Sequence, residues 1–188
     1  MKIIYLLILF LVISLQTQAT EALSEKSIYR LEQRWTSQVG KTLSLSDLKG
    51  RPAIVTMIFT SCPATCPLLV SDIKALDSQL TKSEKAETQY VLFSMDPARD
   101  TPAALLQFSR KMKLDGRWTL LTSNPDQVRE LSAVLGFSYK DLEDGDFTHS
   151  TTLYLLSASG ELLEKKDRGG NSKEFLSKLR SEIRRPSK

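Results

Sequence analysis

Two continuous apolar runs, each followed by a helical pattern, place the strongest constraint on the fold of this chain. Residues 53–59 are AIVTMIF, and residues 90–95 are YVLFSM. Neither run alternates regularly between apolar and polar residues, so each predicts a strand that is buried on both faces. Between them, apolar residues recur at helical spacing from Cys66 to about Leu80. A buried strand, a helix and a second buried strand predict a βαβ unit.

Five further segments continue the alternation: a helix from Thr101-Pro102, a strand at residues 117–122, a helix at residues 124–136, a β-hairpin at residues 150–166 and a last helix from Asn171. Each of these helices begins at a threonine or asparagine, which are good N-cap residues. We expect residues 20–40 to form an irregular lead-in anchored by Leu31 and Trp35. Residues 43–52 should form a short edge element and a turn.

The order of these elements predicts one α/β domain. Strands that alternate with helices indicate a parallel arrangement with right-handed crossovers in the first half of the chain. The hairpin should add antiparallel strands, and its turn falls at Ser159-Gly160. The sheet is therefore expected to be mixed.

The N-terminus has the layout of a secretory signal peptide. Lys2 precedes an apolar run at residues 3–15, and small and polar residues follow up to Ala19. The run holds thirteen residues, which is short for a bilayer span of about 20. We therefore predict a signal peptide over residues 1–19, with cleavage after Ala19 or Ala22. An uncleaved N-terminal anchor is the alternative, with membrane association through the same apolar run.

Both alternatives predict export, to the periplasm or the outer face of the cytoplasmic membrane, of a domain that spans residues 23–188. Removal of residues 1–19 takes away Lys2 alone among the charged residues, so the formal net charge falls from +4 to +3. No basic stretch is interleaved with aromatic residues, and nucleic acid is therefore not an expected partner.

Cys62 and Cys66 are the two cysteines of the chain, and a proline follows each of them. An oxidising compartment would allow them to form a disulfide. Such a bridge would close a very short loop and constrain the unfolded chain little. A redox pair or a metal site is therefore a better explanation of the spacing than a structural disulfide.

The predicted fold places both thiols at a position suited to chemistry. Cys62 follows the first buried strand, and Cys66 falls at the start of the helix, at the carboxyl edge of the sheet where α/β proteins bind ligands. Free amide groups and the helix dipole at this end are expected to favour a thiolate. Thiolates are soft ligands that select Cu(I), zinc or iron–sulfur clusters. The chain has two cysteines, so it cannot form a four-cysteine site by itself.

His149 is the single histidine of the chain. It precedes a strand that is expected in the same sheet, so it could reach the edge where the cysteines lie. The spacing leaves two interpretations open: a metal site that uses His149, and a dithiol redox pair that does not need it.

Three segments together resemble the Sco/SenC family: IFTSCPATCP, FSMDPARDTP and FTHSTTLYLLSASGEL, in this order. The similarity runs from about Gly40 to Gly170. It implies a thioredoxin-like fold, with a central mixed β-sheet flanked by helices and an added β-hairpin.

The resemblance also implies a function. Family members bind copper, as Cu(I) or Cu(II), and help to assemble the binuclear copper site of cytochrome c oxidase. Carried over by motif, the ligands are Cys62, Cys66 and His149, and the two cysteines can cycle between dithiol and disulfide. The implied protein is a metallochaperone for the copper-site subunit of the oxidase or for another exported copper or thiol protein.

The chain departs from the family pattern at two positions. Ala64 and Thr148 stand where many members have aspartates, and Asp96 or Asp146 could take the place of those carboxylates. Asp96 and Asp100, in the segment DPARDTP, are otherwise expected to form the turn before a helix.

A thiol–disulfide oxidoreductase that reduces the cysteines of an exported partner is the alternative function. In that case Cys62 and Cys66 form the redox pair. Their CxxxC spacing is one residue longer than the usual CxxC motif, and His149 would have no role.

Overall fold

The computed structural model describes residues 23–142 and 147–185. The signal peptide or anchor predicted for residues 1–19 lies outside the described residues. Among the helices of the described part, none has both the length and the apolar character needed to cross a membrane.

A mixed seven-stranded sheet forms the centre of the molecule, in the order β2-β1-β5-β4-β3-β8-β9. Its strands are β1 (Arg34–Ser37), β2 (Thr42–Ser44), β3 (Ala53–Ile58), β4 (Gln89–Ser94), β5 (Trp118–Thr122), β8 (Thr152–Leu156) and β9 (Leu162–Asp167). Strands β3, β4 and β5 are parallel, and β8 and β9 join β3 as an antiparallel hairpin. The parallel arrangement that the sequence predicts is confirmed for β3, β4 and β5, and so is the antiparallel hairpin. The first half of the chain is not parallel throughout, because β1 pairs antiparallel with both β2 and β5.

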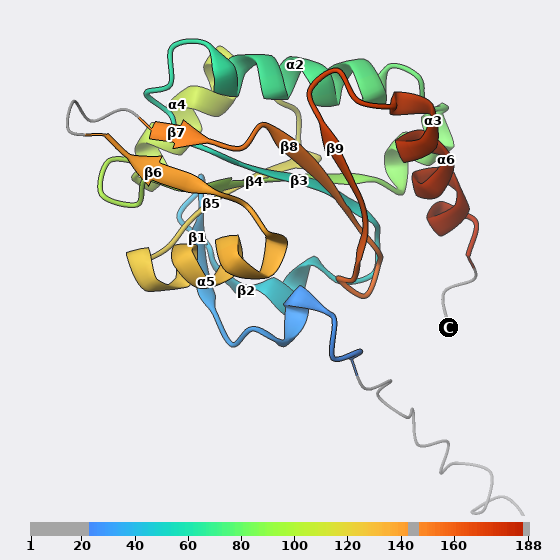
Figure 1. Ribbon diagram of the computed structural model, residues 1–188, viewed down its shortest axis with the longest axis horizontal. Helices are drawn as coiled ribbons and strands as arrows, with labels where there is room; N and C mark the ends of the chain where they lie inside the picture. Colours follow the sequence, from blue (N-terminus) through green and yellow to red (C-terminus); the bar gives the residue numbers. More distant parts are fainter. Residues whose placement is uncertain (1–22, 143–146, 186–188) are drawn as a thin grey trace, which may run out of the picture.

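Helices cover both sides of this sheet (Figure 1). They are α2 (Thr65–Asp77), α3 (Lys82–Ala86), α4 (Pro102–Lys111), α5 (Pro125–Leu135) and α6 (Ser172–Ile183), with short 3₁₀ turns η1 (Ile28–Arg30) and η2 (Leu45–Leu48). Figure 1 shows α2 and α4 on one side of the sheet and α5 on the other. The predicted caps are present, since Thr101 and Asn124 accept backbone N–H groups of α4 and α5.

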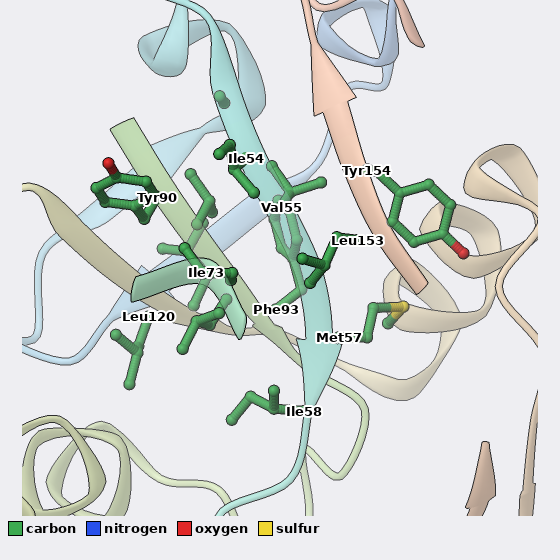
Figure 2. Close-up of a cluster of buried hydrophobic side chains, with 14 of the residues drawn as sticks. Ile54, Val55, Met57, Ile58, Ile73, Tyr90, Phe93, Leu120, Leu153 and Tyr154 are labelled. Carbon is green, nitrogen blue, oxygen red and sulfur yellow. The ribbon is translucent and has the colours of Figure 1, made fainter. Parts of the chain in front are cut away.

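The core lies between the sheet and these helices, and it fixes the start of α2. Every residue of β3, β4 and β8 is buried, as expected for strands covered on both faces. Figure 2 shows Ile73 of α2 packed with side chains of the sheet, among them Ile54 and Phe93. Leu69 and Leu76 of the same helix are also buried. Because α2 is held along its length, its first turn has a defined place beside the end of β3.

The prediction of an irregular lead-in over residues 20–40 is wrong. This segment contains η1 and β1, and β1 lies inside the sheet between β2 and β5. Trp35 is fully buried, and its ring contacts Phe93 with centroids 4.9 Å apart. A strand of four residues is too short for its alternation to stand out in the sequence.

A second sheet was not predicted from the sequence. Strands β6 (Tyr139–Asp141) and β7 (Phe147–His149) pair with each other and not with the large sheet. In Figure 1 they lie at the end of the molecule where β3 leads into α2. This small sheet brings His149 toward the cysteines.

Candidate metal centre

The two cysteines lie where β3 passes into α2. The amide of Cys62 donates to the carbonyl of Phe59 at 3.2 Å, which closes a turn directly after the strand. Cys66 is the second residue of α2, as the sequence predicts. The exposed fraction is 7% for Cys62 and 0% for Cys66, so both thiols belong to the interior of the protein.

Backbone amides hold both sulfurs in place. The amide of Cys66 donates to Sγ of Cys62 at 3.3 Å, and the amide of Phe59 donates to Sγ of Cys66 at 3.4 Å. The two contacts link the end of β3 to the first turn of α2. Each donor can also stabilise negative charge on the sulfur that accepts it.

The expectation that this helix start favours a thiolate is wrong for Cys66. Burial raises the pKa of the Cys66 thiol, and the amide of Phe59 opposes this only in part. The neighbouring Cys62 and Asp100 raise the pKa further. Desolvation disfavours the charged form of a buried acid, so at neutral pH Cys66 holds its proton. A metal that binds this sulfur must therefore displace a proton.

His149 faces the cysteines from the end of β7. Its Nδ1 lies 2.7 Å from the carbonyl oxygen of Ser150. A carbonyl can only accept a hydrogen bond, so Nδ1 carries the proton and the Nε2 lone pair is left for a ligand. The ring of His149 contacts Phe59 edge-on at 5.8 Å and lies nearly parallel to Phe137 at 6.1 Å. These contacts fix its orientation.

The three candidate ligands come together in space. The ligand atoms of Cys62, Cys66 and His149 all lie within 4.8 Å of one another. Two thiols and an imidazole are soft to intermediate donors, a set that suits copper or zinc. The donor chemistry thus fits the metal that the sequence suggests.

The carboxylates considered as replacements for the missing aspartates do not join this group. Ala64 and Thr148 are both exposed. Asp96 is buried and forms a salt bridge with Arg99, and Asp146 lies outside the described residues. Within the described residues the ligand group contains no carboxylate.

Sequence reasoning missed an aromatic cluster around the histidine. Phe59 packs on Phe147, and Tyr139 lies against both Phe137 and Phe147. The guanidinium of Arg99 lies 5.6 Å from the ring centre of Phe147, which connects the DPARD segment to β7. Single aromatic residues in a sequence are usually core residues, so no pattern marked these as neighbours of a site.

Asp100 is the other residue whose place the sequence did not reveal. It is completely buried and accepts hydrogen bonds from Thr60, two residues before Cys62. The segment DPARDTP does form the expected turn before α4, yet its last aspartate also reaches the cysteine loop.

Comparisons with known proteins agree with this site. The family model described as SCO1/SenC matches residues 21–184. A candidate copper-binding protein of Stutzerimonas stutzeri is 34% identical over 142 residues, which cover 73% of this chain and 68% of that protein.

Two solved structures show the same architecture. A SCO1/SenC family lipoprotein from Bacillus anthracis str. Ames is 28% identical, with a TM-score of 0.73 over 86% of this chain and 99% of that chain. BsSco, a Sco-family cytochrome c oxidase assembly protein in which a disulfide switch was identified, is 25% identical, with a TM-score of 0.72 over 88% of this chain and 100% of that chain.

The predicted α/β, thioredoxin-like fold is therefore confirmed, with β6 and β7 as an additional two-stranded sheet. The family model covers most of the chain, including the cysteine turn, the DPARD segment and the strand that ends at the histidine. The chain belongs to the SCO1/SenC family.

Proposed function

We propose that this chain is an exported copper-binding protein that holds one copper ion through Cys62, Cys66 and His149 and helps to assemble the copper site of cytochrome c oxidase. The observation that carries the proposal is the approach of the three ligand atoms to within 4.8 Å of one another. Family membership supports it, as do a relative named for copper binding and a solved relative named for oxidase assembly.

Cys62, Cys66 and His149 have separate roles in metal binding. The two sulfurs supply soft donors that suit Cu(I), and Nε2 of His149 supplies the third. Copper binding at Cys66 releases the proton that burial keeps on the free thiol. The hydrogen bond from Nδ1 to Ser150 keeps the ring in the tautomer that can ligate.

Oxidation of the cysteines is the expected off-switch. If Cys62 and Cys66 form a disulfide, each thiol gives up one proton and one electron to an oxidant, and both thiolate ligands are lost. Copper loading then requires the reduced pair. The disulfide switch identified in BsSco is consistent with this expectation.

The expected partner is the copper-site subunit of the oxidase or another exported copper or thiol protein. His149 is half-buried, whereas both cysteines are buried. A partner would therefore reach the histidine side of the ion first and take the metal by ligand exchange. A copper-transfer assay with purified candidate subunits tests which of them accepts the metal.

The site of action is proposed to be the periplasm or the outer face of the cytoplasmic membrane. The apolar run at residues 3–15 supports export as a signal peptide or anchor, and one relative is a lipoprotein. Cell fractionation of the full chain, with and without residues 1–19, tests this. Recovery of the full chain in the cytosol would contradict it.

The deciding experiment measures copper binding by the reduced domain from residue 23 onward. His149→Ala is compared with Thr148→Ala, a change at an exposed neighbour on the same strand. We expect one copper per chain, a thiolate-to-copper charge-transfer band in the Cu(II) form, and much weaker binding in His149→Ala alone. Equal binding by His149→Ala and wild type would contradict the three-ligand site.

A thiol–disulfide oxidoreductase is the second candidate, and the juxtaposition of the two thiols favours it. Cys62, the less buried of the two, would attack a partner's disulfide, and Cys66 would then displace the reduced partner. This activity needs no histidine. Turnover of a disulfide substrate that is unchanged in His149→Ala, in a protein that binds no copper, would bring it to first place.

A further inference from the structure

Asp100 is the most deeply buried carboxylate near the site. Its exposed fraction is 0%, and among the residues that the structure describes no lysine or arginine forms a salt bridge with it. The neighbouring Arg99 pairs with Asp96 instead. A buried carboxylate without a cationic partner is costly unless it is well hydrogen-bonded. Its hydrogen-bond donors therefore decide whether this carboxylate can be buried here.

Hydroxyl and amide donors surround this carboxylate. Oγ1 of Thr60 donates to it at 2.6 Å, the amide of Thr60 at 3.1 Å, and Oγ of Ser94 at 2.6 Å. Ser94 is the last residue of β4, and Thr60 lies just beyond β3. Asp100 thus ties the ends of two neighbouring strands together.

The hydrogen bonds of Asp100 reach the turn that carries Cys62. Thr60 lies within the turn that the amide of Cys62 closes on Phe59. The same Phe59 donates its amide to Sγ of Cys66. A shift of Thr60 would move this turn, and with it the position of both sulfurs relative to each other.

The backbone around Asp100 is also held in place. The amide of Asp100 donates to the carbonyl of Asp96 at 2.9 Å, and Thr101 caps α4 directly after it. The DPARD segment therefore has a fixed backbone between β4 and α4. A carboxylate on such a backbone can hold in place the loop that donates hydrogen bonds to it.

We propose that Asp100 is a positioning residue of the copper site, which holds Thr60 so that Cys62 and Cys66 direct their sulfurs at one ion. This inference rests on the proposed copper-binding function. Asp100 is not a member of the ligand group itself. It acts through the backbone of the turn that bears the ligands.

The test compares two changes at Asp100 with a change at a second carboxylate. Asp100→Ala removes the acceptor for Thr60, whereas Asp100→Asn keeps one acceptor oxygen. Asp77→Asn is the matched control, because Asp77 is a hydrogen-bonded carboxylate at the opposite end of α2. At a rise of about 1.5 Å per residue, it lies roughly 16 Å along the helix from Cys66.

Two readouts separate positioning from mere folding. The first is Cu(I) affinity by chelator competition, with the Cu(II) charge-transfer spectrum. The second needs no metal: it is the rate at which glutathione disulfide converts Cys62 and Cys66 into an internal disulfide, with release of two glutathione thiols. This rate depends on the thiolate fraction as well as on the placement of the two sulfurs. Both changes at Asp100 remove the same charge, so a difference between them reports how well the sulfurs are placed.

We expect Asp100→Ala to weaken copper binding by about 10–100-fold, as changes behind a metal ligand do, and to slow internal disulfide formation. Asp100→Asn should recover most of both. Asp77→Asn should lower the urea midpoint and leave both readouts at wild-type values. Equal losses in Asp100→Ala and Asp100→Asn would overturn the proposal, and so would wild-type values in Asp100→Ala.

Thr60→Val covers the case in which Asp100→Ala does not fold. It removes only the hydroxyl donor and keeps the shape of the side chain. We expect a smaller loss in the same two readouts, and wild-type values would overturn the proposal. If wild type itself binds no copper, the proposed function fails, and the disulfide rate still tests whether Asp100 positions the sulfurs.

Discussion

The cysteine half and the histidine half of the site rest on different kinds of structure. Cys62 lies between β3, which is buried at every residue, and α2, which is packed on the sheet and has Cys66 as its second residue. His149 ends β7, which pairs only with β6 in a sheet of its own. Two strands alone are marginally stable, so side-chain packing must hold the histidine in place.

The difference shows which changes the site can tolerate. The cysteine half is part of the core, so a change there alters metal binding and folding together. The histidine half is held by rings, chiefly Phe59 and Phe137. Changes in β6 and β7 should therefore alter the site with little effect on the rest of the molecule.

Replacement of a sulfur should have the largest effect on metal binding. In Cys66→Ser the soft thiolate donor becomes a hard hydroxyl. We expect Cu(I) affinity to fall by more than the ~10–100-fold that a change behind a ligand costs. Chelator competition measures the loss, with Ser71→Ala on the exposed side of the same helix as the control. Wild-type affinity in Cys66→Ser would show that the two sulfurs do not act as a pair.

Truncation of one ring in each half compares their contributions to stability. Phe59 is a core residue directly after β3 and is 2% exposed, although its ring also contacts His149. Phe147 of β7 is half-buried. We expect Phe59→Ala to lower the free energy of unfolding by ~3–5 kcal/mol. The loss in Phe147→Ala should be about 2 kcal/mol, because this ring contacts both Phe59 and Tyr139 and each aromatic pair contributes about 1 kcal/mol.

Urea unfolding of both variants gives these values. Equal losses would mean that the small sheet is as much a part of the core as β3. The comparison between the two halves would then be wrong.

The pH dependence of stability should follow the cysteine half. Burial raises the pKa of Cys66 above its ordinary value of 9.0. Above that pH the unfolded chain loses the thiol proton while the folded chain keeps it, so stability falls as pH rises. Below it, the contribution is fully present. The slope for one proton is at most about 1.4 kcal/mol per pH unit.

Measurements of the free energy of unfolding from pH 8 to 10.5 for wild type, Cys66→Ala and His149→Ala isolate the contribution of the Cys66 proton. Tyr29 and Tyr90 also have a pKa raised by burial, and they weaken all three proteins alike at the alkaline end. We expect Cys66→Ala to have the shallower slope and His149→Ala to match wild type. Parallel curves for wild type and Cys66→Ala would contradict the assignment.

The same contrast explains what the sequence could predict. The cysteine half follows from local patterns: a continuous apolar strand, a turn that contains a proline and a helical repeat. The histidine half depends on β6 and β7, strands of three residues each, which are too short to show a period. Their position results from contacts among distant rings, and a single sequence does not reveal such contacts.

Asp100 illustrates a further limit. Its motif has turn chemistry that explains it locally, and the structure confirms that turn. The contact with Thr60 spans 40 residues of sequence, and nothing in the local pattern indicates it. A motif that is fully explained by its turn can still have a second role across the sheet.

The smallest effect is expected from a charge added to the histidine half. Thr148 is exposed beside His149, so in Thr148→Asp a carboxylate would approach the ion through solvent. An exposed charge contributes at most ~1 kcal/mol, or about fivefold in affinity. The gain should be greater for Cu(II) than for Cu(I), because the attraction grows with the charge of the ion. Thr148→Asn, of the same shape without the charge, should leave both affinities unchanged. If Thr148→Asp instead changed Cu(I) affinity as much as Cys66→Ser does, the histidine half would determine binding as strongly as the cysteine half. The aromatic rings that contact His149 would then determine the geometry of the metal site as strongly as the core strand β3 does.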